Sequence, residues 1–129
     1  MPRICSILVV ESHDGVRRVL GEALDADGYR FTLVENGAAM REALERESYH
    51  IAIIDVSMRG EDGFALAEEA ATLGLSVILT TADRNKFDAV ERSGRPHVLK
   101  PYHIAQLLEL LAEVVKNDGV GCVRRKRLN

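Results

Sequence analysis

The sequence has no tryptophan, few aromatic residues and only two cysteines. The scarcity of aromatic rings argues against a platform on which single-stranded nucleic acid could stack its bases. Cys5 lies in an apolar run and Cys122 in a polar segment, so we expect neither a disulfide framework nor a metal site, as is usual in a reducing cytoplasm. No apolar run approaches the roughly 18 residues that a transmembrane helix needs. The apolar stretch Ile4–Val10 ends at Glu11 without a cleavage site, so we also expect no signal peptide.

Acidic residues outnumber basic ones, which gives a formal net charge of −3 over 129 residues. Without the four positive charges of Arg124–Arg127 the remaining net charge is −7. Affinity for nucleic acid comes mainly from Lys and Arg, so we expect no nucleic-acid partner, and we also expect no membrane partner. The length fits one domain over residues 1–117, and the Gly- and Arg-containing residues 118–129 are predicted to form a mobile basic tail.

Hydrophobic periodicity predicts an alternation of strands and helices. Nearly continuous apolar runs predict buried strands, and apolar residues at helical spacing predict amphipathic helices. The predicted strands are Ile4–Val10, Arg30–Val34, Ile51–Ile54, Leu75–Thr80 and His97–Leu99. A helix is expected after each strand, the first capped by Ser12 or Asp14 and the fourth short. Five such alternations predict an α/β fold, a doubly wound five-stranded parallel sheet with helices on both faces.

Polar side chains follow four of the predicted strands. In an open parallel sheet, ligands bind beyond the carboxyl ends of the strands. Those ends carry Glu11 with Ser12, Asp55, Thr80 with Thr81, and Lys100. One polar residue at a strand end is commonly a turn residue or a helix cap. Carboxylates, hydroxyls and an ammonium at four strand ends together indicate a functional site.

At these strand ends the sequence resembles the response-regulator receiver domain of two-component signalling (CheY-like), and the resemblance runs from about Ile4 to Val115. It rests on four segments in order: Ile7-Leu8-Val9-Val10-Glu11, Ile53-Ile54-Asp55-Val56-Ser57-Met58 with Asp62-Gly63-Phe64, Val77-Ile78-Leu79-Thr80-Thr81-Ala82, and Val98-Leu99-Lys100-Pro101-Tyr102. It implies the flavodoxin-like strand order 2-1-3-4-5 and a signalling module that is not an enzyme. The Asp-x-Asp pattern of aspartate-based phosphatases is absent, because Ser57 stands two residues after Asp55.

The resemblance implies that Asp55 is the phosphoacceptor, which takes its phosphoryl group from a histidine kinase or a phosphotransfer protein. It also implies a Mg²⁺ cofactor held by Glu11, Asp55 and the backbone carbonyl of Ser57, hard oxygen ligands of the kind this ion prefers. The family usually has two adjacent acids after the first strand, and Ser12 replaces one of them. Loss of that carboxylate weakens the metal position, so we expect weak Mg²⁺ binding.

Three further residues receive roles from the same resemblance. Lys100 would pair with the acyl phosphate, and Thr81 would hydrogen-bond a phosphoryl oxygen. His97 stands where the family has a switch aromatic, and a partly packed polar side chain is the alternative for it. The bond before Pro101 is the expected cis peptide, because X–Pro bonds tolerate the cis form best.

The interval between Thr81 and Lys100 is short and contains Pro96, which predicts a curtailed fourth helix. A similar shortening occurs in single-domain receivers associated with atypical histidine kinases of α-proteobacteria, and the chain resembles that subgroup.

Two functions stay open from the sequence. The first is a cytoplasmic single-domain response regulator that signals by protein–protein contact, with a dimer through the face of the last strand and helix left open. The second is a pseudo-receiver, an interaction module that works without phosphorylation. Ser12 is the residue that favours the second interpretation.

Overall fold

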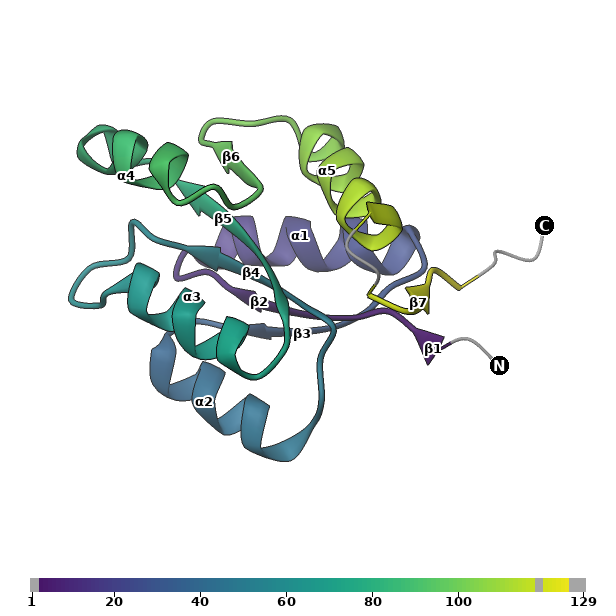
Figure 1. Ribbon diagram of the computed structural model, residues 1–129. Helices are drawn as coiled ribbons and strands as arrows, with labels where there is room; N and C mark the ends of the chain where they lie inside the picture. Colours follow the sequence, from purple (N-terminus) through teal and green to yellow (C-terminus); the bar gives the residue numbers. More distant parts are fainter. Residues whose placement is uncertain (1–2, 118–119, 126–129) are drawn as a thin grey trace.

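The computed structural model describes residues 3–117 and 120–125. Within them, five parallel strands form the central sheet in the order β3-β2-β4-β5-β6 (Figure 1). The strands are β2 (Ser6–Val10), β3 (Arg30–Val34), β4 (Ile51–Asp55), β5 (Ser76–Thr81) and β6 (His97–Leu99). The arrangement confirms the predicted doubly wound sheet, and its order is the flavodoxin-like one.

Helices cover both faces of this sheet (Figure 1). α1 (Asp14–Ala26) and α5 (Ile104–Asn117) bury Leu20, Leu24, Leu107 and Leu111 against one face. α2 (Gly37–Arg46), α3 (Gly63–Thr72) and α4 (Phe87–Arg92) bury Met40, Leu66, Ala70 and Val90 against the other. The central strand β4 is buried along its whole length, which explains its continuous apolar sequence.

The fourth helix is short, as the sequence predicts. A 3-10 turn, η1 (Arg84–Lys86), precedes the six residues of α4. Asp83 caps this turn by accepting a hydrogen bond from the Asn85 amide, and Gly94 ends the segment in the left-handed conformation. The segment therefore offers less than two turns of α-helix between β5 and β6.

The first helix begins differently from the sequence prediction. Its cap is His13, whose Nδ1 accepts a hydrogen bond from the Val16 amide at 3.2 Å. Ser12 lies before the cap and Asp14 is the first helical residue, so neither serves as the cap. An imidazole nitrogen is an effective acceptor when its ring is neutral, which is why a histidine can take the place of Ser or Asp here.

The structure contradicts the expectations for the cysteines and for the start of the tail. Cys5 and Cys122 form a disulfide, and β7 (Cys122–Val123) pairs in parallel with β1 (Arg3–Ile4). The predicted first strand is therefore split at Cys5, and 120–125 lie against the domain instead of forming a mobile tail. The cysteines are 117 residues apart, so only the fold brings them together. Residues 118–119 and 126–129 of the predicted tail lie outside the described residues.

No helix among the described residues has the length and apolar character needed to cross a membrane.

The close packing of α3 against the residue that follows β4 predicts a sensitive position at Gly63. A Cβ there would lie 2.5 Å from the Cα of Val56, which is backbone and cannot rotate away. We expect Gly63→Ala to lower the free energy of unfolding by about 2 kcal/mol, because overpacking outweighs the better helix propensity of alanine. Gly15→Ala, which meets only the His13 side chain at 3.1 Å, is the control. Urea denaturation measures both, and equal stabilities would contradict the packing argument.

Candidate functional site

Three charged side chains meet at the carboxyl edge of the sheet. The Lys100 Nζ lies 2.6 Å from Glu11 Oε1 and 3.0 Å from Asp55 Oδ2. Glu11 directly follows β2, Asp55 ends β4 and Lys100 directly follows β6. Parallel strands end at the same edge, so residues separated by up to 89 positions come within hydrogen-bonding distance.

Both carboxylates are buried, and the ionisation of Asp55 depends on the groups around it. Glu11 is 2% exposed and Asp55 is 4% exposed, while the Lys100 side chain is 16% exposed. Burial alone would raise the pKa of Asp55, but two hydrogen bonds from Ser57 and the Lys100 ammonium outweigh it and hold that pKa below its ordinary value. Burial alone would lower the pKa of Lys100, but hydrogen bonds and charge from Glu11 and Asp55 hold it above its ordinary value. Asp55 is therefore a carboxylate at neutral pH.

The Ser57 side chain is part of the site, although the sequence analysis assigned only its carbonyl. Its hydroxyl donates to Asp55 Oδ1 at 2.5 Å, and its amide donates to the same oxygen at 2.8 Å. The Ala82 amide in turn donates to the Ser57 hydroxyl oxygen at 3.3 Å, which links the ends of β4 and β5. The Asp-x-Ser spacing was the available signal, because a short turn allows such bonds to a carboxylate two residues earlier.

Lys86 is a second residue that the sequence analysis missed. Its Nζ donates to the backbone carbonyl of Val56 at 2.6 Å, which ties η1 to the loop after Asp55. A lysine in a short polar segment gives no sequence signal for this contact. Lys86 therefore places a positive charge beside Val56, the residue that follows Asp55.

Thr80 and Thr81 are both buried at the end of β5. Thr80 stands beside Asp55 in the sheet register. The Thr81 hydroxyl oxygen accepts a hydrogen bond from the Asp83 amide at 3.1 Å, so this hydroxyl is engaged with the loop that starts η1. Both hydroxyls belong to the edge that the sequence analysis predicted.

Ser12 and His97 lie at the border of the site. Ser12 is exposed, and its carbonyl accepts from Arg17 at 3.3 Å. The His97 ring is half-buried, with Nδ1 2.9 Å from the Arg95 carbonyl oxygen, which is the partly packed alternative that the sequence left open. Neither side chain has a hydrogen bond to Glu11, Asp55 or Lys100 in the described chain.

The peptide bond between Lys100 and Pro101 is cis, the bond singled out from the sequence. The Lys100 amide donates to the Thr81 carbonyl at 2.8 Å, which fixes the backbone of Lys100 against the end of β5. This hydrogen bond gives the lysine a defined position from which it approaches the two carboxylates.

The donor set at this edge fits a Mg²⁺ ion but supplies few charges. Glu11 and Asp55 offer carboxylate oxygens, and Mg²⁺ commonly binds through one or two carboxylates while keeping several waters. The described residues contain no cluster of three or more His, Cys, Asp or Glu side chains placed to hold a metal. The Lys100 ammonium pairs with both carboxylates, so it competes with a cation for the same oxygens.

The ammonium between two buried carboxylates predicts a pH-dependent loss of stability in Lys100→Met. Removing one partner leaves like charges buried together, so we expect a loss of about 3 kcal/mol in the free energy of unfolding at pH 7. A carboxyl whose pKa is lowered by folding stabilises the protein above its ordinary pKa, and that contribution disappears as the pH falls through the lowered value. The difference between the variant and the wild type should therefore shrink in acid.

The pKa of Asp55, followed by carbon NMR of its carboxyl group, should rise in Lys100→Met. Lys86→Met is the control, since this lysine contacts a backbone carbonyl and neither carboxylate. An unchanged Asp55 pKa in Lys100→Met would contradict the proposed charge balance.

The chain matches the family model for the response regulator receiver domain over residues 7–112. One curated relative is transcriptional regulatory protein RprY of Bacteroides fragilis, 32% identical over 106 residues, which are 78% of this chain and 45% of the relative. Another is response regulator protein FleR of Pseudomonas aeruginosa, 32% identical over 112 residues, which are 82% of this chain and 24% of the relative. The chain thus spans about half the length, or less, of these curated relatives.

Solved structures agree with the fold. Response regulator protein TrrA of Thermotoga maritima, in complex with Mg²⁺-BeF, is 25% identical with a TM-score of 0.75, covering 86% of this chain and 99% of that one. The receiver domain of the response regulator TorR is 22% identical with a TM-score of 0.78, covering 87% and 97%. The fold, the ordered strand ends and the family match lead to one conclusion: this chain belongs to the response-regulator receiver domain family.

Proposed function

We propose that Asp55 accepts a phosphoryl group from the phosphohistidine of a histidine kinase or a phosphotransfer protein. The observation that carries this proposal is the buried Asp55 carboxylate 3.0 Å from the Lys100 ammonium, at the edge where such sheets bind ligands. Receiver domains are signalling modules, and the match over residues 7–112 supports a transfer role for this one.

The proposed step forms one bond and breaks another. A carboxylate oxygen of Asp55 attacks phosphorus in line with the leaving imidazole, and the P–N bond breaks with its electrons going to that ring. The low pKa of Asp55 keeps the nucleophile ionised, so no base is needed to remove a proton. Such a transfer depends mainly on positioning and on neutralising the phosphoryl charge.

Three donors of this chain would stabilise the transferred group. Lys100 already donates a hydrogen bond to an Asp55 oxygen. After transfer, its ammonium would pair with the negative charge of the acyl phosphate. The Thr81 hydroxyl would exchange its contact with the Asp83 amide for a phosphoryl oxygen. The Ala82 amide, now donating to Ser57, is a third donor at this position.

A divalent cation would add charge neutralisation at the phosphoryl oxygens. Mg²⁺ would be held by Glu11, Asp55 and the Ser57 carbonyl. Ser12 stands where the family usually has a second acid, so this side of the metal site is weakened. Binding requires Lys100 to release the carboxylate oxygens that it now contacts. We therefore propose a weak site.

Output would leave the domain by protein–protein contact. Movement of Thr81 toward a phosphoryl group would release the Asp83 amide, which begins η1 and α4. His97, whose ring is half-buried beside this segment, would complete the switch pair. The size of such a shift is limited by the contacts that differ between the two states.

The proposed donors use ATP, so we place this chain in the cytoplasm. The acidic body disfavours nucleic acid as the partner of the domain. Three expectations stay predictions: a dimer through the face of β6 and α5, membership of the α-proteobacterial subgroup, and action as a single-domain response regulator.

The second candidate function is a pseudo-receiver that binds partners without phosphorylation. Ser12 supplies no carboxylate, and Lys100 already balances the two acids that remain. A site in which Lys100 pairs with both carboxylates is stable without a metal or a phosphoryl group. Labelling of Asp55 distinguishes the two functions.

Asp55→Asn should abolish Mg²⁺-dependent labelling by acetyl phosphate and the response to beryllofluoride, because an amide oxygen cannot form the acyl phosphate. Asp83→Asn is the matched control, since the Asp83 side chain caps η1 and the substitution leaves the backbone amide that bonds Thr81 in place. Intact-mass spectrometry measures the added phosphoryl group. Labelling of the Asp55→Asn protein equal to that of the wild type would disprove the assignment, and an unlabelled wild type would favour the pseudo-receiver.

Ser12→Asp should tighten Mg²⁺ binding by about 1–2 kcal/mol, because it restores one charge close to the ion in a partly solvated site. Calorimetric titration with MgCl₂ measures the affinity, and Ser12→Asn provides a control of similar size without the charge. If both variants bind Mg²⁺ as the wild type does, position 12 is not part of the metal site.

A further inference from the structure

The segment 120–125 is held against the edge of the sheet that lies opposite the Asp55 site. β7 pairs with β1, which directly precedes β2, and both lie near the chain termini (Figure 1). The Cys5 amide donates to the Val123 carbonyl at 2.8 Å, and the Arg125 amide donates to the Gly28 carbonyl at 2.7 Å. Gly28 has φ of +87°, and a Cβ there would lie 2.5 Å from the Arg125 carbonyl oxygen. The backbone of this segment is therefore closely fitted to the turn after α1.

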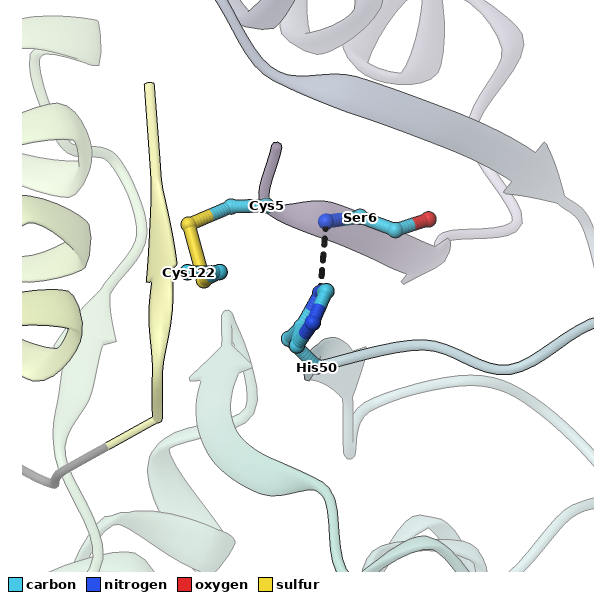
Figure 2. Close-up of a disulfide and its surroundings, with 4 residues drawn as sticks. All are labelled: Cys5, Ser6, His50 and Cys122. Carbon is cyan, nitrogen blue, oxygen red and sulfur yellow. Dashed lines mark hydrogen bonds between the residues drawn. A yellow bond between two sulfur atoms is a disulfide. The ribbon is translucent and has the colours of Figure 1, made fainter. Parts of the chain in front are cut away.

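A covalent bond joins this segment to the core. Figure 2 shows the Cys5 and Cys122 sulfur atoms linked, with Ser6 and His50 beside them. The two Cα atoms are 4.8 Å apart, within the usual range of roughly 4.4–6.8 Å. Cys5 is 0% exposed and Cys122 is 5% exposed, and both belong to the apolar cluster under α1 and α5. The Ser6 amide, next to Cys5, donates to His50 Nδ1 at 3.0 Å, which holds the start of β2 in place.

The non-covalent contacts of the segment are few. The β1–β7 ladder has two residues in each strand, and isolated two-stranded pairs are marginal in water. Arg124 pairs with Asp27 at 3.1 Å, but these side chains are 51% and 30% exposed, and exposed ion pairs contribute little. The disulfide is therefore the strongest single link between the segment and the sheet.

We propose that Cys5 and Cys122 form a reversible redox site that latches residues 120–125 onto the sheet. Disulfides in reducing compartments are usually transient or redox-sensing, and this step rests on the cytoplasmic location in the proposed function. Formation consumes a disulfide oxidant such as oxidised glutathione. The two protein thiols lose two electrons, the Cys5–Cys122 bond forms, and the oxidant leaves as two thiols that carry the two protons. A dithiol reductant reverses the exchange.

The latch acts at the end of the sheet away from Glu11, Asp55 and Lys100. Oxidation should therefore change the docking of 120–125 while leaving phosphoryl acceptance at Asp55 unaltered. The released state would expose the backbone of β1 and the surface that Cys122 covers in the apolar cluster.

The test uses the full chain equilibrated with defined ratios of reduced and oxidised glutathione. Acid quenching followed by alkylation of the unfolded chain and mass spectrometry should show conversion between zero and two free thiols. Amide hydrogen exchange should show at least a roughly tenfold loss of protection at Arg125 and Cys5 in the reduced protein, while Leu8 in central β2 stays protected. A bond that persists in excess dithiothreitol under native conditions, or equal protection of Arg125 in both states, would overturn the proposal.

Variants separate the latch from general unfolding. Cys122→Ser should show the reduced exchange pattern at every glutathione ratio, and Arg124→Ala should keep the oxidised pattern because it loses only the exposed ion pair. Labelling of Asp55 by acetyl phosphate, measured in both redox states, should be equal. Absence of labelling in both redox states would count against the proposed phosphoryl transfer and would leave the redox proposal standing. Labelling that depends on the redox state would show that the disulfide affects the Asp55 site, which contradicts the proposal that the two ends of the sheet act independently.

Discussion

The Lys100 ammonium between Glu11 and Asp55 is the interaction on which the arrangement of this edge depends. Two carboxylates buried side by side repel each other, and their burial is tolerable because one cation lies 2.6 and 3.0 Å from them. The surrounding structure holds that lysine in place through the backbone hydrogen bond from its amide to the Thr81 carbonyl. The same balance keeps Asp55 ionised, as the proposed phosphoryl transfer requires, and it also makes Lys100 a competitor for any metal.

The two ends of the sheet carry different features: the charged site lies at one end and the disulfide at the other. At the carboxyl end, turns after β2, β4, β5 and β6 bring polar side chains together. At the other end, the disulfide closes almost the whole chain into a loop of 117 residues. A loop of about 100 residues corresponds to a reduction in unfolded-state entropy worth about 4.7 kcal/mol in the chain-entropy model. The disulfide thus constrains the unfolded chain without contacting Glu11, Asp55 or Lys100.

The elements and the site residues were largely predictable because each depends on local pattern. The apolar run Ile51–Ile54 predicted a buried strand, and the break around Pro96 predicted a short fourth helix; both are confirmed. The choice of His13 as a helix cap was not predictable, because Ser12, His13 and Asp14 are adjacent and only backbone dihedrals decide among them. Lys86 gave no signal either, since its partner is a backbone carbonyl 30 residues away.

Local pattern was enough to specify the alternation of strands and helices, and with it the edge to which Glu11, Asp55 and Lys100 had to come. Periodicity and strand-end position are properties of neighbouring residues, so they can be read without coordinates. The folded chain was needed to establish that Ser57 bonds the Asp55 carboxylate through its side chain, that His97 faces the Arg95 carbonyl, and that Cys5 meets Cys122. The cysteine pairing depends on the direction in which the chain leaves α5, and no local pattern encodes that direction over 117 residues.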